Sequence, residues 1–282
     1  MPNRAADIFL QAASLCREDA RRRGSLIELE DGCTVLVAGD IHGHRANFSR
    51  IVSYAHLAAD PSRRLVLQEI IHGPPDARTG HDRSVDLLLR AARLKVDHPE
   101  QVLFLLGNHD ASQVTGGEIT KDGCGVCEAF TKGVRYAFGD DGDEVLAAVG
   151  EFLLSAPLAV RTPGGVLMSH SLPCPDKADD AQVEILHRPC TLDDLRRGRS
   201  GYEWVWGRRQ DAGLVDTLAE KLGVEFFVLG HYHIETGYEV ICPRAAALAS
   251  DSPHGCVAEF SGDEPLTSET FEAAVRRIIA LR

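Results

Sequence analysis

The feature that most constrains this chain is a set of four apolar segments, each of which ends in a short polar motif. The clearest is LFLLGNHD at residues 103–110, and the others are VLVAGDIHGH at 35–44, VLMSHS at 166–171 and FFVLGHYH at 226–233. An apolar run that stops at a glycine or a polar residue is typical of a buried β-strand. Open α/β sheets keep their ligand sites beyond the carboxyl ends of such strands. The pattern therefore predicts an α/β fold with one site built from these strand ends.

The polar motifs carry side-chain types that bind metals. Asp40 and His42 stand two residues apart, and residues so spaced in an extended segment point the same way. His231 and His233 repeat that spacing after another apolar run. Glu69 follows a further predicted strand, where a carboxylate can give one oxygen to each of two ions. The expected metal ligands are Asp40, His42, Glu69, Asn108, His170, His231 and His233.

This donor set contains nitrogen and oxygen but no thiolate, so it suits Mn, Fe or Zn better than Ca or Mg. The ligands suffice for two divalent or transition metal ions, which lie about 3.5–4 Å apart in sites that clamp phosphoryl groups. Each motif alone also has an ordinary structural explanation. Asp40 can cap the helix that follows it, and Glu69 can be a solvated acid at a strand end. The metal-site interpretation rests on all the motifs together.

Composition narrows the class of protein. The chain has 282 residues, 44% of them hydrophobic, and no linker separates the expected ligands, so we expect a single domain over residues 1–282. A net charge of −12 without a Lys/Arg block argues against strong nucleic-acid binding. No apolar run approaches the roughly 18 residues of a membrane span, and the N-terminal segment lacks a signal-peptide core. Eight mostly isolated cysteines favour a reducing cytoplasm over a disulfide framework.

Periodicity predicts the elements around the site. Apolar residues at helical spacing predict a helix over residues 5–23, closed by Arg21 to Arg23, and a short strand completes an N-terminal unit at 1–30. The segment 111–150 is less regular until a helix at 145–154. Residues 173–209 predict a surface loop or lid. Further helices are expected at 46–57, 84–96, 214–222 and 271–281, and further strands at 65–67, 156–160, 165–168, 225–229, 238–241, 246–249 and 256–260.

Two other clusters each have a chemical and a structural interpretation. Cys124 and Cys127 form a C-x-x-C pair, which can bind zinc or form a redox pair, but no further ligands stand at convincing spacing. Unmetalled thiols in a loop are therefore the simpler interpretation. Trp204 and Trp206 stand beside Arg208, an arrangement that can clamp a phosphate or stack a base. The same segment can equally be an anchored loop.

With these motifs in their order, the chain resembles the calcineurin-like metallophosphoesterases. The likeness runs from about residue 33 to 260 and is carried by GDIHGH at 39–44, GNHD at 107–110, SH at 169–170 and GHYH at 230–233. Within that superfamily the chain looks most like the bacterial phosphoprotein phosphatases and diadenosine tetraphosphatases. The features that favour this branch are the GDIHG form of the first motif, SAPLAV at 155–160, WVWGRR at 204–209 and ALASDSPHG at 247–255.

The resemblance implies a fold and a set of roles. The implied fold is a four-layer α/β/β/α sandwich of two mixed β-sheets flanked by helices. The implied reaction is direct attack on phosphorus by metal-bound hydroxide, without a phosphoenzyme, on a phosphorylated protein or nucleotide. Glu69 would bridge the two ions, and His109 would give a proton to the leaving oxygen. Asp40, His42 and His233 would hold the first ion, and Asn108, His170 and His231 the second.

The second motif departs from the family pattern. The family writes Gly-Asp-x-x-Asp-Arg-Gly after the second strand, whereas this chain has QEIIHG at residues 68–73. Glu69 is one methylene longer than the family's bridging Asp, and misplacement by about a bond length can cost ~100-fold in rate. The partner that steadies His109 becomes His72 or nothing, unless Asp82 or Asp76 reaches in from the loop.

The phosphate-gripping arginine of that motif is also displaced. Arg83 is the first candidate to replace it and Arg78 the second, and either requires the 73–82 loop to fold back over the site. Arg208 is a further candidate for binding the substrate phosphate.

These observations support a binuclear metal-dependent phosphoesterase that resembles the phosphoprotein phosphatases. The altered second motif supports a different hypothesis, a weakly active or inactive metal-binding regulatory module. A third is a dinucleoside polyphosphate hydrolase, in which Trp204 or Trp206 stacks a base. The residues alone do not select the substrate, the metal, the oligomeric state or a role for Cys124 and Cys127.

Overall fold

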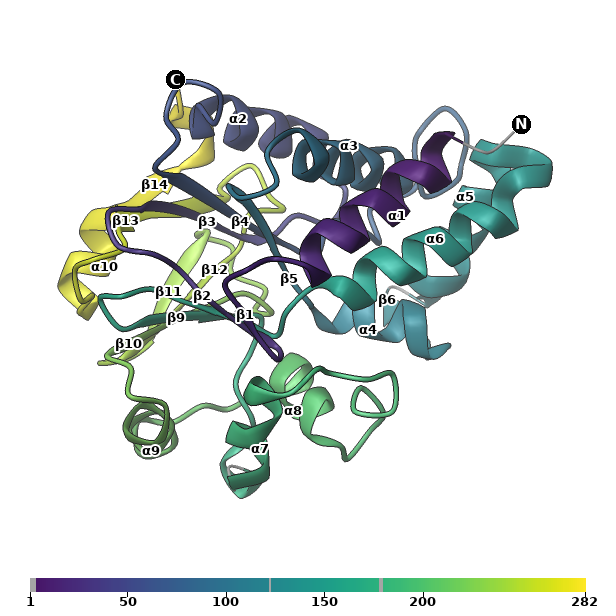
Figure 1. Cartoon of the computed structure of the whole chain (residues 1–282). Helices are drawn as coiled ribbons and strands as arrows, with labels where there is room; N and C mark the ends of the chain where they lie inside the picture. The colour runs from purple at the N-terminus through teal and green to yellow at the C-terminus, as the bar shows by residue number, and fades with distance from the viewer. Residues whose placement is uncertain (1–3, 122, 178–179) are drawn as a thin grey trace.

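The computed structural model of the chain describes residues 4–121, 123–177 and 180–282. Two β-sheets lie face to face at the centre, and helices cover their outer faces (Figure 1). The first sheet has, in spatial order, β14 (Val275–Arg277), β13 (Cys256–Ser261), β3 (Thr34–Asp40), β4 (Arg63–Gln68) and β5 (Val102–Leu105). The second sheet has β1 (Arg22–Arg23), β2 (Leu26–Glu28), β8 (Ala159–Arg161), β9 (Val166–Ser169), β10 (Phe226–Leu229), β12 (Ala245–Leu248) and β11 (Tyr238–Cys242). The expected sandwich of two mixed sheets is confirmed.

The strand sequences explain why both faces of each sheet are covered. Val35 and Val37 pack in the core between the sheets, whereas Leu36 and Ala38, which alternate with them, belong to the larger cluster that includes the helices. Alternate residues of a strand point to opposite faces, so a run that is apolar at every position is buried on both. Each fully buried Val or Leu contributes about 1.5–3 kcal/mol relative to an exposed one. The continuous apolar runs thus place these strands in the middle layers.

The helices form the two outer layers. On one side are α1 (Arg4–Arg17), α2 (Arg45–Ala55), α3 (Ser84–Asp97), α5 (Val126–Phe138) and α6 (Gly142–Ser155), with α1 packed against both α3 and α6 (Figure 1). On the other side are α7 (Asp180–Glu184), α8 (Ser200–Trp206) and α9 (Ala212–Leu222), and α10 (Ser268–Ala274) lies beside the sheets. None of these described helices is long and apolar enough to cross a membrane.

The first helix ends earlier than its sequence pattern indicates. We expected it to run to Arg23, but α1 stops at Arg17, and Arg22 and Arg23 form β1. The guanidinium of Arg22 donates to the carbonyls of Cys16 and Ser155, which satisfies backbone oxygens where the helix ends. The arginine triplet therefore serves tertiary contacts rather than a last helical turn.

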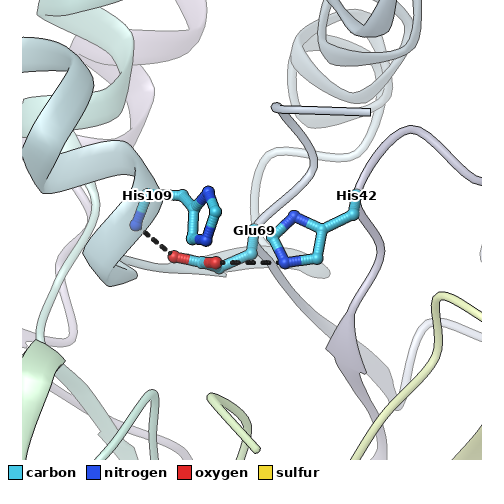
Figure 2. A group of neighbouring side chains, drawn as sticks. All are labelled: His42, Glu69 and His109. Atoms are coloured by element: carbon cyan, nitrogen blue, oxygen red, sulfur yellow. Dashed lines mark hydrogen bonds and ion pairs between the residues drawn. The ribbon is translucent and has the colours of Figure 1, made fainter. Parts of the chain in front are cut away.

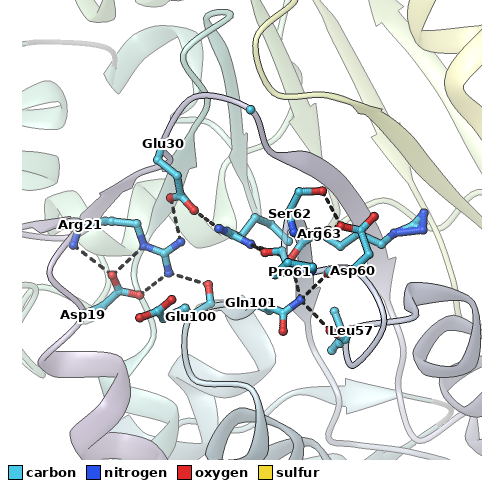
Figure 3. Close-up of polar contacts among 12 residues, drawn as sticks. Asp19, Arg21, Glu30, Leu57, Asp60, Pro61, Ser62, Arg63, Glu100 and Gln101 are labelled. Atoms are coloured by element: carbon cyan, nitrogen blue, oxygen red, sulfur yellow. Dashed lines mark hydrogen bonds and ion pairs between the residues drawn. The ribbon is translucent and has the colours of Figure 1, made fainter.

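A polar network fixes the segment after α1. Arg21 donates to the carboxylate of Asp19, to that of Glu30 and to the backbone carbonyl of Glu100 (Figure 3). Glu30 also pairs with Arg64 at the start of β4. The network joins the end of the first helix to strands of the first sheet. A cavity of about 530 Å³ lies beside it and contains none of the expected metal ligands.

Three further expectations about elements differ from the structure. The predicted helix at 271–281 is instead the short α10, followed by β14 and a 3₁₀ turn at Ile278–Ala280. Residues Val275 to Arg277 pair with β13 at the sheet edge, so tertiary strand pairing overrides the local helical spacing. The expected loop at 173–209 contains α7 and α8, and the expected irregular stretch after the central strand contains α4 (Asn108–Thr115) and α5.

Candidate metal centre

The expected ligands converge where strands of both sheets end. β3, β4 and β5 are parallel neighbours in one sheet, and β9 and β10 are parallel neighbours in the other. Their carboxyl ends meet at a cleft of about 220 Å³. His170 lies under this cleft and is fully buried. The cleft is lined by Asp40, His42, Glu69, Asn108, His109, Ile119, Thr120, Lys121, Arg208, His231, Tyr232, His233 and Asp251.

Several residues of the site have a left-handed backbone conformation that residues other than glycine rarely adopt. Outside glycine, six described residues have positive φ, and four of them are at the site: His42 (40°), Glu69 (44°), His72 (62°) and His231 (68°). A left-handed conformation costs a non-glycine residue on the order of 1–3 kcal/mol and persists only where the surroundings enforce it. Strain of this kind clusters at functional sites. Here it turns the side chains at the strand ends toward one another.

Three ligand atoms meet in the deepest part of the site. Oδ1 of Asn108 is 2.8 Å from Nε2 of His170 and 2.8 Å from Nδ1 of His231, and the two ring nitrogens are 3.1 Å apart. Nδ1 of His170 faces Oε1 of Gln68 at 2.8 Å, and Nε2 of Gln68 donates to the carbonyl of Ala38. His170 must therefore carry its proton on Nδ1, which leaves a lone pair on Nε2 aimed at the amide oxygen. Lone pairs that face one another in this way create a site for a cation.

A hydrogen bond at Nδ1 also fixes the tautomer of His42. Its Nδ1 lies 3.0 Å from the carbonyl oxygen of Ile71, which can only accept, so Nδ1 is the donor. Nε2 of His42 therefore carries a lone pair and lies 3.6 Å from Oε2 of Glu69 and 4.0 Å from Oδ2 of Asp40. A metal-binding histidine commonly donates its other N–H to a carbonyl, which fixes the tautomer. His42 already has the tautomer of a ligand.

Glu69 lies at the centre of the arrangement. Figure 2 shows its carboxylate between His42 and His109, whose backbone N–H donates to Oε1 at 2.7 Å. Oε2 is buried and has no hydrogen-bond partner in the described part of the chain. Two groups of side chains offer ligand atoms that all lie within 4.8 Å of one another, His42 with His109 and Asp40 with His170, and Glu69 belongs to both. A carboxylate shared by two such groups fits the bridging position between two ions.

The buried carboxyl groups of the site are costly to ionise, because they are close together and out of contact with water. Burial raises the pKa of Asp40 to about 6 and that of Asp110 to about 7. The pKa of Glu69 is raised well above its usual value by burial and by the nearby Asp40. Buried like charges of this kind are costly unless a cation neutralises them. The acids therefore fit a site that holds metal.

The imidazoles are held in the neutral form that binds metals. Burial is the main cause that lowers the pKa of His231 to about 3 and places that of His170 well below its usual value. A neutral ring offers a lone pair, whereas an imidazolium cannot bind a cation. The donor set, its protonation and its unpaired atoms all fit bound divalent cations.

The partner of His109 is an imidazole rather than a carboxylate. Nδ1 of His72 lies 2.9 Å from Nδ1 of His109, and Nε2 of His72 lies 3.0 Å from Oε1 of Gln113. Nε2 of Gln113 donates to Oγ1 of Thr131 at 3.1 Å. His72 is nine-tenths or more buried. Of the partners considered from sequence, His72 occupies the place, whereas Asp76 closes its own turn with Thr79.

This chain of hydrogen bonds assigns the protons. The oxygen of Gln113 accepts from Nε2–H of His72, so Nδ1 of His72 carries a lone pair and accepts from Nδ1–H of His109. Nε2 of His109 is then left with a lone pair. Burial and the nearby His42 lower the pKa of His109 to about 2, and burial lowers that of His72 to about 4. The pair is neutral, unlike an imidazole paired with a carboxylate.

Two glycines allow this close packing. A Cβ on Gly107 would overlap the carboxylate of Glu69, and one on Gly230 would overlap Oε1 of Gln68 and lie 2.6 Å from Oδ1 of Asp40. Both positions therefore require glycine, because any side chain there would clash with its neighbours. Gly107 lets the ends of β4 and β5 approach each other within the first sheet, and Gly230 lets the second sheet approach the first at the ligands.

The structure brings together most of the residues that the sequence singled out. All seven expected ligands, together with His109 and Arg208, line the cleft or lie directly under it. Arg83 is not brought to the cleft: its guanidinium pairs with Asp86 and lies over the ring of Tyr136. Trp204 is fully buried and donates to the carbonyl of Gln182, so the expectation that it stacks a base is wrong.

Four residues of the site were missed from sequence. Gln68 orients His170, Asp110 accepts from the backbone of Gly107, and Lys121 and Asp251 line the cleft. Gln68 could have been found, because it is a polar residue at the end of an apolar run, next to Glu69. Lys121 had no local signal, since only the tertiary fold carries its hairpin to the cleft.

Comparisons with known proteins agree with this geometry. The chain is 21% identical over 271 residues to a serine/threonine-protein phosphatase of Caenorhabditis elegans, an alignment that covers 89% of this chain and 54% of that one. The chain thus spans about half the length of this curated relative. Its fold is similar to that of a Saccharomyces cerevisiae protein serine/threonine phosphatase with similarity to human phosphatase PP5, with TM-score 0.70, 16% identity and coverage of 91% of this chain and 82% of that one.

A more distant structural likeness is to the cold-active protein-tyrosine phosphatase of a psychrophile, Shewanella sp., with TM-score 0.53, 15% identity and coverage of 89% and 80%. At these identities the solved structures support the fold alone. The family described as calcineurin-like phosphoesterase matches residues 33–235, which is more than half of the chain. The chain belongs to the calcineurin-like phosphoesterase family.

Proposed function

We propose that this chain is a single-domain, binuclear metal-dependent phosphoesterase that hydrolyses phosphate esters. The observation that carries the proposal is the position of Glu69, whose buried carboxylate belongs to both groups of potential ligands. Asp40, His42 and His233 would hold the first ion, and Asn108, His170 and His231 would hold the second. The nitrogen and oxygen donors suit Mn, Fe or Zn. Eight free cysteines support a reducing compartment such as the cytoplasm.

The residues around the cleft have different roles in the proposed hydrolysis. When bound, the ions lower the pKa of a water and offset charge on the phosphate oxygens. Arg208 and Lys121 line the cleft and supply positive charge for the remaining phosphate oxygens. Because Nε2 of His109 carries a lone pair, this ring must take up the proton that the water gives up before it can give one to the leaving oxygen. His72 holds the ring by its other nitrogen.

Metal analysis combined with one ligand substitution tests the proposal. We expect two transition-metal ions per chain after loading with Mn, Fe or Zn, and Mn-dependent hydrolysis of an aryl phosphate. His170→Ala should lose one ion and lower kcat/KM by more than the roughly 10–100-fold that outer partners of a ligand cost. His187→Ala, at an exposed histidine outside the cleft, is the matched control and should change neither. A chain that binds no transition metal would exclude the function.

The altered second motif favours one other candidate, a metal-binding regulatory module with little turnover. His72 replaces the acid that the family places beside His109, and the resulting pair carries no negative charge. In that case the chain would bind two ions but leave both aryl phosphates and phosphopeptides intact. A dinucleoside polyphosphate hydrolase has weaker support, from Trp206, whose ring centroid is 6.3 Å from that of His231. A screen of dinucleoside polyphosphates against phosphopeptides separates these activities.

A further inference from the structure

A second cavity opens beside the metal cleft. Its volume is about 380 Å³, which falls in the range of about 300–1,000 Å³ that is typical of small-molecule sites. His42, Lys121 and Asp251 line both cavities, so the two meet at these three side chains. The cavity is lined by His42, His72, Gly73, Pro74, Pro75, Asp82, Lys121, Cys124, Gly125, Val126, Ala129 and Asp251.

The two cavities differ in chemistry. The metal cleft is lined mainly by acids, imidazoles and two cations, and at about 220 Å³ it is the smaller of the two. The adjoining cavity instead has apolar walls from Pro74, Pro75, Val126 and Ala129. Apolar surface of this kind favours the apolar part of a ligand by about 25 cal/mol for each Å² removed from water. A ligand that fills both cavities therefore has a charged end and an apolar end.

Two segments outside the sheets build the apolar walls. The loop after β4 is held by a bridge between Pro75 and Asp82, and its two prolines restrict the backbone. The opposite wall comes from the hairpin of β6 (Thr120–Lys121) and β7 (Cys124–Gly125) and from the start of α5. The cavity thus lies between two locally braced segments, both of which reach the metal cleft.

The charges around the second cavity limit what it can accept. Asp82 and Asp251 are acidic, and Lys121 stands where the cavity meets the cleft. Among the residues that the structure describes, the lining therefore offers no cation beyond Lys121 for a second phosphate. Two carboxyl groups also disfavour an anionic ligand through like-charge repulsion. An uncharged, ring-bearing alcohol fits these walls better than a nucleotide or a polyphosphate.

We propose that this second cavity, which we name the leaving-group pocket, binds the apolar alcohol portion of an aryl phosphate monoester. The assignment rests on the proposed phosphoesterase function and names its substrate class. The phosphate occupies the metal cleft, and the ester oxygen lies at the junction formed by His42, Lys121 and Asp251. Water then forms a new P–O bond and gives up a proton, the ester P–O bond breaks, and the alcohol oxygen takes that proton. The alcohol leaves from the pocket, while inorganic phosphate stays in the cleft.

The first test fills the pocket. Ala129 on α5 is half-buried at the pocket wall, so Ala129→Trp should occupy the space of an aryl group. With the Mn-loaded chain, we expect kcat/KM for naphthyl phosphate to fall at least about tenfold and that for methyl phosphate to stay within about twofold. Lys132→Trp is the matched control, because Lys132 is on the same helix, exposed and outside the lining, and it should alter neither value. An equal loss for both substrates, or no loss, would overturn the pocket assignment.

The second test needs no turnover and no substitution at the pocket wall. Cys124 is an exposed thiol that lines the pocket. Phenylphosphonate, a non-hydrolysable probe, should slow alkylation of Cys124 in the metal-loaded chain at least about fivefold, whereas inorganic phosphate should not. Cys124→Ser identifies the alkylated site. Equal protection by both probes, or by neither, would contradict the pocket. Protection without hydrolysis of any phosphate ester would keep the pocket and exclude the catalytic function.

Discussion

At the scale of single residues, Glu69 has an unusual backbone and a central position in the site. Its backbone is left-handed, with φ of 44°, and its carboxylate accepts from the backbone N–H of His109. Gly107 leaves no room for a side chain between itself and that carboxylate. The longer side chain is therefore accommodated by the backbone around it, and the extra methylene is part of the site's geometry.

Glu69→Asp is expected to lower metal binding and kcat/KM, although it introduces the residue type that the family pattern has at this position. The substitution withdraws the carboxylate by about one C–C bond, or about 1.5 Å, from the N–H of His109 and from both ligand groups. Misplacement on this scale costs on the order of 100-fold in rate. Metal content by elemental analysis and kcat/KM for an aryl phosphate measure the effect. A gain in rate would mean that Glu69 impairs the natural site and would favour the regulatory hypothesis.

The His72–His109 pair gives a prediction that does not depend on metal. The hydrogen bonds to Gln113 and Thr131 place the proton of His72 on Nε2 and that of His109 on Nδ1. ¹⁵N chemical shifts of the ring nitrogens should show these two tautomers at neutral pH. Gln113→Leu removes the acceptor and should broaden or reverse the tautomer of His72. The opposite tautomers in the unmodified chain would show that the amide of Gln113 donates to His72.

At the scale of elements, the segment that leads into α3 contains a buried acid. Asp82 lies just before the helix, and its Oδ1 accepts from the backbone N–H of Ser84 at 2.7 Å. Burial raises the pKa of Asp82 to about 6 in the folded state, against an ordinary value of 3.8. The folded chain therefore binds this proton more tightly than the unfolded chain does. The carboxyl group stabilises the fold when protonated and costs stability when charged.

Asp82→Asn tests the sign of this linkage. The stability contribution of Asp82 is fully present below pH 3.8 and is lost as the pH rises through about 6, by about 2–3 kcal/mol at 1.36 kcal/mol per pKa unit. Asparagine keeps the acceptor oxygen without the charge. The variant should therefore be more stable than the natural chain at pH 7 and should lack the fall in stability between pH 4 and 6. Urea unfolding across this range measures it, and parallel curves for both chains would contradict the assignment.

At the scale of the whole molecule, the site exists because two sheets approach at their carboxyl ends. Gly230 follows β10 of the second sheet, and a side chain there would strike Gln68 and Asp40 at the ends of strands in the first. Ser250, after β12, donates its backbone N–H to the carbonyl of Asp40. The metal ligands thus depend on the distance between the layers as well as on each strand.

A single added methyl group tests this dependence. Gly230→Ala should push the layers apart, lower the free energy of unfolding by about 1–3 kcal/mol, as overpacking does, and lower metal affinity as well. Gly150→Ala is the matched control, because Gly150 is inside α6 with nothing near its added Cβ. That change should stabilise the fold by about 0.5–1 kcal/mol and leave metal binding unchanged. Chemical unfolding and metal titration of both variants give the comparison, and normal metal affinity in Gly230→Ala would refute the dependence.

The sequence by itself determined which segments are buried strands and which side chains follow them, and the resemblance to a known family implied the two-sheet sandwich. Strand runs such as residues 35–39 and 226–229 are apolar at every position, and polar motifs follow them directly. Such runs predict strands that are buried on both faces. Strand ends are a local property, and the ligands on them could therefore be named in advance. The helix predicted at 271–281 failed because strand pairing at an open sheet edge outweighs a weak local preference.

Only the tertiary structure decided the partners of those side chains. The sequence left His72, Asp82 and Asp76 open as partners of His109, and the fold selected His72. Lys121 lines the cleft although its position along the chain gives no sign of that contact. Arg83 turned to Asp86 and Tyr136, although its sequence position suited the cleft equally well. Hydrogen bonds and ion pairs act over a few ångströms, so which groups meet depends on the packing of whole layers rather than on any local pattern.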